Sequence, residues 1–119
     1  MKENIVKTRS FKFAVSIVKI CRELIENKKD YILSQQLMKS GTSIGANIRE
    51  ADNAESKADF IHKMSIAQKE ADETLYWLEL LKECLLINEE VFLIHFNECE
   101  EIYRIIKAII LTAKRNNTK

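Results

Sequence analysis

Acidic side chains recur at helical spacing in two stretches of the sequence, and paired carboxylates can bind metal ions or transfer protons. Glu50 ends a polar row in the first stretch, and Glu70 and Glu73 lie three residues apart in the second. A helical bundle that holds two iron atoms needs a Glu-x-x-His pair on each of two helices. Here Glu73 stands where that histidine would be, and neither His62 nor His95 follows a Glu at this spacing. We therefore predict no catalytic residue, no metal site and no cofactor, and a carboxylate-based metal enzyme is the weakest alternative.

The only two glycines, Gly41 and Gly45, lie four residues apart in a chain without proline. A nucleotide-binding loop needs a lysine directly after its second glycine and a strand before its first. Ala46 follows Gly45 instead, and no strand pattern precedes the pair. Gly41 also falls in the apolar row of Leu37 and Ile44. We therefore expect another helix to pack closely on Gly41, and Gly45, off this row, to serve a different contact such as one between subunits.

Four amphipathic helices must position these residues. Apolar side chains recur every three or four residues over about 10–28, 35–53, 57–86 and 89–114, and no stretch shows strand alternation. Ser34, Ser56 and Asn88 are the expected N-caps of the last three helices. The short connections predict one all-α domain, 1–119, with the topology of an antiparallel up-down-up-down four-helix bundle.

A polar row lies beside the apolar row of the second helix, and the third helix offers charged groups at similar spacing. Pairing the two helices about a turn near residue 54 places Glu50 near Lys57 and Lys39 near Glu70. Such interhelix pairs fix register more than they add stability. The predicted polar seam comprises Lys39, Ser43, Asn47, Glu50, Lys57, Lys63, Glu70 and Glu73. A ligand site at this seam is the alternative.

The fourth helix carries two apolar rows, although a bundle helix needs only one. The first row is Val91, Ile94, Ile102, Ile105 and Ile109, and the second is Phe92, Phe96, Cys99, Tyr103, Ile106 and Ile110. The additional row favours a subunit interface. The alternative is a core helix with a broad buried face.

Three cysteines, Cys21, Cys84 and Cys99, lie in apolar helical contexts without paired spacing. We expect buried free thiols rather than disulfides or a zinc site. The longest uncharged apolar run, 108–113, is far too short to cross a bilayer, which takes roughly 20 residues. The first residues also lack the apolar core of a signal peptide. We expect a cytoplasmic protein without a membrane partner.

The charge is unevenly distributed although the net charge is only +1. Residues 1–29 carry a net +5, residues 104–119 a net +5, and residues 30–103 a net −9. An up-down bundle brings both chain ends together, so a cyclic oligomer would repeat the basic termini as a ring that attracts phosphates. The candidate nucleic-acid-binding residues are Lys2, Lys7, Arg9, Lys12, Lys114, Arg115 and Lys119. The alternative is an ordinary pair of solvated termini, favoured by a pI near 7.7 and by the lack of evident exposed aromatic residues among the cations.

The second and third helices carry the motifs of a known family. These are Ser43-Ile44-x-x-Asn47-Ile48-x-Glu50-Ala51, Asp59-Phe60-x-x-Lys63 and Ile66-Ala67-x-Lys69-Glu70-Ala71-x-Glu73-Thr74-x-Tyr76-Trp77-Leu78. Ser10-Phe11-Lys12-Phe13 and Leu33-Ser34-x-Gln36-Leu37 are similar as well. In these motifs the chain resembles the four-helix bundle proteins associated with intervening sequences of bacterial large-subunit ribosomal RNA genes. The chain departs from the family at Lys39, where the family often has an arginine. Because a lysine cannot make a bidentate contact with a carboxylate, we do not expect such a contact at this position.

The resemblance implies a bundle that assembles as a cyclic homo-oligomer, commonly a pentamer, without established catalytic activity. A related accessory protein of diversity-generating retroelements helps a reverse transcriptase engage nucleic acid. The expected function is therefore a non-enzymatic assembly module that binds RNA or a ribonucleoprotein partner such as a reverse transcriptase. A protein-protein scaffold that binds no nucleic acid is the alternative.

Overall fold

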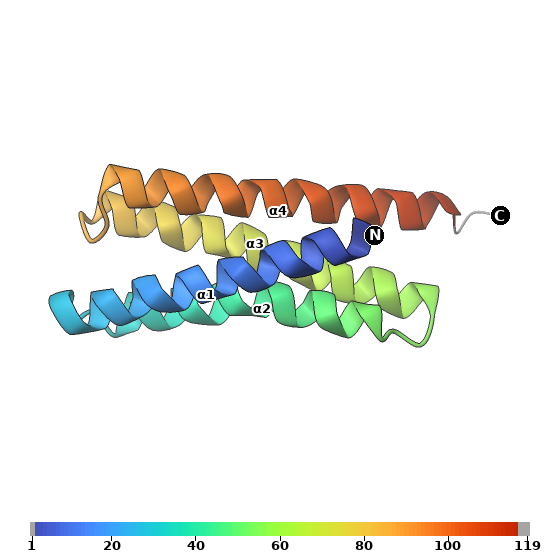
Figure 1. Ribbon diagram of the computed structural model, residues 1–119, viewed down its shortest axis with the longest axis horizontal. Coiled ribbons are helices and arrows are strands. Elements are labelled where there is room, and N and C mark those ends of the chain that lie inside the picture. The colour runs from blue at the N-terminus through green and yellow to red at the C-terminus, as the bar shows by residue number, and fades with distance from the viewer. Residues whose placement is uncertain (1, 117–119) are drawn as a thin grey trace.

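The computed structural model describes residues 2–116, with the side chains of residues 5–116. These residues form four helices and no strand: α1 (Lys2–Lys28), α2 (Ile32–Asp52), α3 (Lys57–Glu83) and α4 (Glu89–Asn116). Successive helices run in opposite directions along a body of 53 × 22 × 21 Å (Figure 1). The structure confirms the all-α four-helix bundle. Over the described residues, none of the helices carries an apolar stretch long enough to span a bilayer.

Two of the three predicted N-caps are confirmed. The Ser56 hydroxyl accepts a hydrogen bond from the Asp59 amide at 3.0 Å, and the Asn88 side-chain oxygen accepts one from the Val91 amide at 2.8 Å. The prediction for Ser34 is wrong, because the Asp30 carboxylate accepts hydrogen bonds from both the amide and the hydroxyl of Ser34. Asp30 thus accepts a hydrogen bond from one of the free backbone amides in the first turn of α2. The helix begins at Ile32, and Ser34 is buried inside it.

Helix α1 begins at Lys2, eight residues before the predicted start. Val6 and Ser10 are both buried, so two further turns contact the bundle. The Ser10 hydroxyl donates to the Lys7 carbonyl within the same helix, which satisfies this polar group without water. Helix α3 ends at Glu83, and Leu85, two residues further on, adopts a left-handed conformation with φ 61°.

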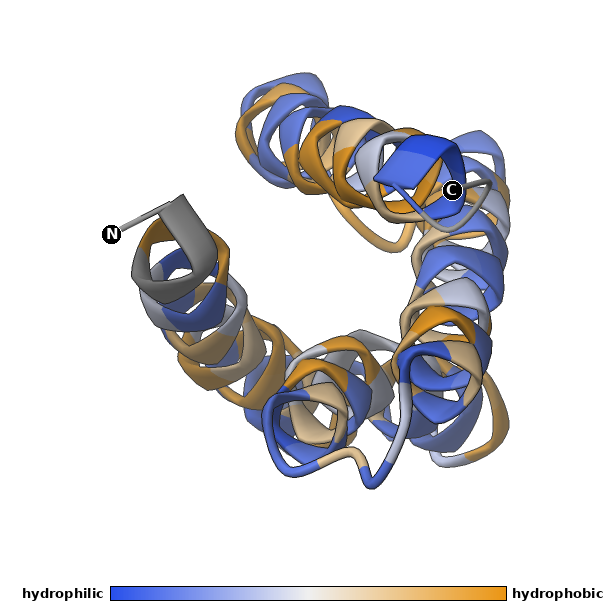
Figure 2. Cartoon of the chain, turned by 90° about the vertical axis from the view of Figure 1, so that its right-hand side faces the viewer, coloured by the Kyte–Doolittle hydropathy of each residue, from blue (hydrophilic) through white to orange (hydrophobic). Residues whose placement is uncertain are grey.

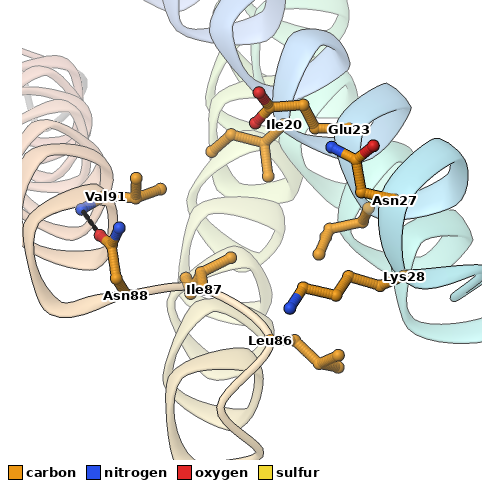
Figure 3. Close-up of a pocket in the computed structure, with 9 residues that line it drawn as sticks. Ile20, Glu23, Asn27, Lys28, Leu86, Ile87, Asn88 and Val91 are labelled. Atoms are coloured by element: carbon orange, nitrogen blue, oxygen red, sulfur yellow. Dashed lines mark hydrogen bonds between the residues drawn. The ribbon is translucent and has the colours of Figure 1, made fainter.

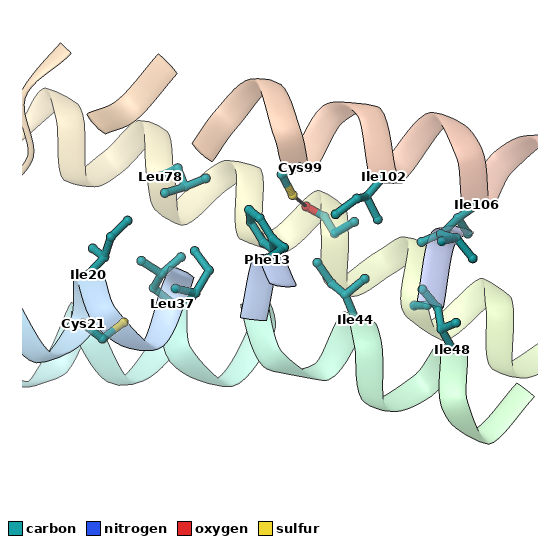
Figure 4. Close-up of a cluster of buried hydrophobic side chains, with 14 of the residues drawn as sticks. Phe13, Ile20, Cys21, Leu37, Ile44, Ile48, Leu78, Cys99, Ile102 and Ile106 are labelled. Carbon is teal, nitrogen blue, oxygen red and sulfur yellow. Dashed lines mark hydrogen bonds between the residues drawn. The ribbon is translucent and has the colours of Figure 1, made fainter. Parts of the chain in front are cut away.

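Apolar side chains from all four helices form one core along the bundle axis. Phe13 of α1, Leu37 and Ile44 of α2, Leu78 of α3 and Ile102 of α4 lie in this layer (Figure 4). Each of them is at most 2% exposed. Burying side chains of this size contributes about 1.5–3 kcal/mol each, which is the main force that holds the helices together.

Both glycines of α2 face α1 at close range. A Cβ atom on Gly41 would lie 2.9 Å from Cγ2 of Ile17, and one on Gly45 would lie 3.3 Å from Oγ of Ser10. Neither glycine has a positive φ, so the absent side chain matters here rather than conformational freedom. Gly45 therefore has its neighbour within the chain, where the sequence pattern suggested a contact such as one between subunits.

Helices α1 and α4 close the bundle less tightly than the other neighbouring pairs. Viewed along the axis, the four helices form an arc whose ends, α1 and α4, lie apart (Figure 2). The first turn of α1, the last turn of α4 and the α2–α3 turn all lie toward the same end of the bundle, on the right in Figure 1. We call it the terminal end.

Candidate functional site

The polar seam between α2 and α3 has one bridging ion pair among its predicted members. Lys63 Nζ lies 2.9 Å from Glu50 Oε1, and this pairing raises the pKa of Lys63. The expected Glu50–Lys57 pair is absent from the described ion pairs, and Lys57 lines a groove beside α4 instead. Glu50 thus pairs with a lysine six residues further along α3 than expected, because the sequence does not determine the rotation and register of one helix against the other.

Two other seam members bond to their own helix. The Ser43 hydroxyl donates to the Lys39 carbonyl at 2.6 Å, and the Asn47 amide donates to the Ser43 carbonyl at 2.9 Å. A second polar contact across the seam is a buried pair of hydroxyls, Thr74 and Ser40, 2.9 Å apart. Thr74 belongs to the third family motif, Ile66–Leu78. Its hydrogen bond to Ser40 could have been predicted only from its place among the buried residues of α3. The pair helps to set the register of α2 against α3.

Glu70 is the seam carboxylate with a perturbed pKa. Desolvation and the neighbouring charge of Glu73 raise its pKa, and the positive charges of Lys39 and Lys69 lower it by less. Among residues 5–116, no group of three or more His, Cys, Asp or Glu side chains lies in position to hold a metal ion. The seam therefore offers a charged surface with one destabilised carboxylate.

Two of the three cysteines are buried. Cys21 donates to the Ser34 carbonyl and Cys99 to the Ala71 carbonyl, and burial raises the pKa of both thiols to about 12. The prediction of three buried thiols is wrong for Cys84, which is exposed just beyond the end of α3. The helix stops before the apolar row reaches that position, so the thiol faces solvent.

Ion pairs engage two of the candidate nucleic-acid-binding residues. Lys7 Nζ lies 2.6 Å from Asp52 Oδ2 of α2. Arg9 forms a bidentate pair with Glu98 of α4 at 2.8 and 3.0 Å, and this hydrogen bonding raises the Arg9 pKa. Arg9 therefore ties α1 to α4 where the two helices meet.

Three further cations, Lys12 of α1, Arg49 of α2 and Lys114 of α4, are exposed and form no ion pair among the described residues. Lys12 and Lys114 belong to the cluster predicted at the chain termini, so we call these three the terminal cations. The Arg9–Glu98 pair sets Lys12 beside the first half of α4, whereas Lys114 lies in the last turn of that helix. Arg49 was missed in the sequence because it belongs to the acidic middle of the chain. Arg115 is exposed as well, whereas the side chain of Lys2 and all of Lys119 lie outside the described residues.

The two apolar rows of α4 merge into one broad face toward the bundle. Phe92, Cys99, Ile102, Ile106 and Ile110 are buried, and Val91, Phe96, Tyr103, Ile105 and Ile109 are partly buried against the core. Ile94 is 59% exposed. The extra row thus mostly widens the face of α4 that packs on the bundle.

Two hollows lie where α1 and α4 face each other. At the terminal end, a groove of about 650 Å³ lies between Ile5 of α1, Phe60 of α3 and Ile105 and Ile109 of α4. A smaller hollow of about 140 Å³ lies at the opposite end, where Lys28 reaches toward Leu86 and Ile87 (Figure 3). The larger groove leaves apolar side chains open to a partner.

An exposed aromatic ring lies among the cations of α1, although the sequence showed none there. Phe11 is 59% exposed and shares a surface hollow with Lys7, Lys12 and Arg49. Phe13, two residues further along, is buried in the core instead. The structure therefore places an aromatic ring beside cations of α1 and α2.

Comparison with known proteins identifies the family. A search among curated proteins gave no match. A crystal structure of a protein of unknown function from the S23 ribosomal protein family of Bacteroides thetaiotaomicron VPI-5482 superposes with a TM-score of 0.91 at 49% identity, covering 92% of this chain and 98% of that one. The model of the 23S rRNA-intervening sequence proteins matches residues 2–108. The chain belongs to the 23S rRNA-intervening sequence protein family.

Proposed function

We propose that this protein is a non-catalytic, cytoplasmic assembly module whose cyclic homo-oligomer, a pentamer, binds RNA through the terminal ends of its bundles. The observation that carries the proposal is the surface hollow that Lys7 and Lys12 of α1 share with Arg49 of α2, together with the exposed Lys114 in the last turn of α4. A cluster of exposed cations attracts phosphates from a distance, and a ring of such clusters multiplies the effect.

The ion pairs at this end leave the cluster able to bind phosphate. Lys7 and Asp52 are both about one-third exposed, and exposed pairs contribute little to stability, typically less than about 1 kcal/mol. A phosphate can therefore replace Asp52 as the partner of Lys7. Arg9 donates two hydrogen bonds to Glu98, and we assign it to the fold rather than to RNA.

The groove between α1, α3 and α4 supports self-association. Its walls are mostly apolar, and Ile5 is 54% exposed in the isolated chain. A second copy seated there would bury these side chains close to Lys114 in the last turn of α4. Stable interfaces bury about 800 Å² on each partner, so the groove would be the centre of a larger contact.

The family name connects these proteins with ribosomal RNA genes, which supports RNA or a ribonucleoprotein as the ligand rather than DNA alone. A protein-protein scaffold is the second candidate, and the apolar groove is the observation that favours it. A reverse transcriptase would be a partner of either kind, as protein or through its RNA.

The test compares two variants of equal charge. One replaces the terminal cations Lys12, Arg49 and Lys114 by serine, and its control replaces Lys19, Arg22 and Lys28, exposed on the far half of α1. Binding of a fluorescein-labelled RNA hairpin with an unpaired tail is followed by anisotropy, and mass by light scattering. We expect the control to bind as the wild type does and the terminal variant to bind at least about tenfold more weakly. RNA binding that is absent at low salt while the oligomer persists would leave the protein scaffold instead.

A further inference from the structure

Phe11 lies on the outer face of α1 with cations on both sides. Lys7 precedes it by one helical turn, Lys12 follows it directly in the sequence, and Arg49 of α2 lines the same hollows. The ring is 59% exposed, and single exposed apolar residues are common in proteins. Here the ring matters because of the shape of the surface around it.

Two hollows meet at the ring of Phe11. One, of about 440 Å³, has a floor of small side chains, Ala14, Thr42 and Ala46, with Gly45 between them. The other, of about 320 Å³, lies toward Thr8 and Lys12. Both hollows are also lined by Lys7 and Arg49. Each is many times the roughly 30 Å³ that one water molecule occupies, and Phe11 lines both of them.

The low floor follows from how α1 and α2 pack. Gly45 lies against the backbone of Ser10, so the two helices approach without a side chain filling the groove between them. Glu50 also borders this hollow, but its carboxylate is bonded to Lys63. The groups that remain for a ligand are therefore an aromatic ring, small side chains and cations.

We propose that Phe11, with Lys7, Lys12 and Arg49, forms a stacking site for an unpaired nucleotide of RNA. The proposal rests on the RNA-binding function and names the part of the RNA that is recognised. A base stacks on the ring of Phe11, and the adjoining phosphates contact Lys12 and Arg49. Bases of an RNA duplex are stacked on each other and do not reach such a ring, so the site selects single-stranded segments.

The experiment compares one RNA strand alone with the same strand annealed to its complement. Wild-type protein, Phe11→Ala and Phe11→Trp are titrated into each labelled RNA by anisotropy. Tyr31→Ala is the matched control, since Tyr31 has the same 59% exposure but lies at the opposite end of α1, in the turn to α2. Because Phe11 is exposed, we expect Phe11→Ala to fold, which circular dichroism and light scattering verify.

We expect the wild type to prefer the single strand, and Phe11→Ala to lose about tenfold in affinity for it with no change for the duplex. Phe11→Trp should restore binding, and Tyr31→Ala should match the wild type. An equal loss on both RNAs, or no loss on either, would overturn the stacking site and leave RNA binding intact. A lower oligomer mass for Phe11→Ala would also overturn it, by making Phe11 a subunit contact. Wild-type protein that binds neither RNA would refute the proposed function itself.

Discussion

Replacing Gly41 by alanine should destabilise the bundle, although alanine is the better helix former. Ile17 is fully buried, and the new Cβ would lie 2.9 Å from its Cγ2, 3.0 Å from its Cγ1 and 3.3 Å from its Cβ. The backbone fixes the Cβ atom of Ile17, and a change of its χ1 rotamer would leave one γ-carbon in one of the two close positions, so α1 must shift. Overpacking of this kind costs about 1–3 kcal/mol, against a gain in helix propensity of about 1 kcal/mol. The expected net loss is about 1 kcal/mol.

Gly45→Ala is the matched control on the same helix. Its Cβ would lie 3.3 Å from Oγ of Ser10, a tight contact that a small shift of this hydroxyl relieves, and 3.4 Å or more from the Ser10 backbone. The propensity gain of about 1 kcal/mol should therefore dominate. Urea unfolding followed by circular dichroism, at one fixed protein concentration, measures both variants. A Gly41→Ala protein more stable than the wild type would refute the close-packing argument.

A double-mutant cycle tests the contact itself. Ile17→Ala removes the atoms that the new Cβ would meet and leaves a cavity, at a cost of about 2–5 kcal/mol in the wild-type background. In the Gly41→Ala background the added methyl group fills part of that cavity, so the cost should fall by at least about 1 kcal/mol. Additive effects would show that Gly41 and Ile17 do not interact.

Three further predictions concern single groups. A double-mutant cycle of Arg9→Ala and Glu98→Ala should give a coupling energy of about 1 kcal/mol that falls in high salt, and no measurable coupling would contradict the bidentate pair that joins α1 to α4. The folded-state pKa of Glu70 is raised, so the folded protein favours the protonated, uncharged carboxyl group. The stability that this group contributes is fully present below the unfolded pKa and is lost as pH rises through the folded pKa. Glu70→Gln should therefore raise the free energy of unfolding at neutral pH and lose this advantage below about pH 4, near the ordinary pKa of glutamate, while a gain independent of pH would argue for a packing effect. Iodoacetamide should label the native protein once, at Cys84, and Cys84→Ser should leave native protein unlabelled; rapid labelling of either buried thiol would contradict its burial.

The sequence predicted the helices well because local signals mark them. Apolar rows, the capping side chains of Ser56 and Asn88, and the absence of strand alternation all act within one helix. The start of α1 was missed because Ser10 interrupts the apolar row that continues to Val6, and a serine is buried there without cost only because it bonds to its own helix. The start of α2 was missed because the Asp30 carboxylate accepts the hydrogen bond of the Ser34 amide, so the helix begins before Ser34, with Tyr31 as its N-cap.

The candidate sites were harder to predict because they depend on how the helices are rotated against each other. The charges of Glu50 and Lys63 were both evident, but their pairing depends on the register of α2 against α3. Phe11 and Arg49 belong to different helices and different charge segments, and only packing along Gly45 brings them to one surface. Conversely, Arg9 reads as a free cation until α4 places Glu98 beside it.

The salt dependence of RNA affinity tests the proposed function most directly. Wild-type protein, the terminal variant and its matched control are titrated with the labelled hairpin from about 50 to 200 mM salt, and log Kd is plotted against log salt concentration. Each phosphate contact that is lost lowers the slope by about 0.7–0.9, so the terminal variant should have a slope smaller by about 2–3 while the control retains that of the wild type. Equal slopes for all three proteins would contradict binding at the terminal end.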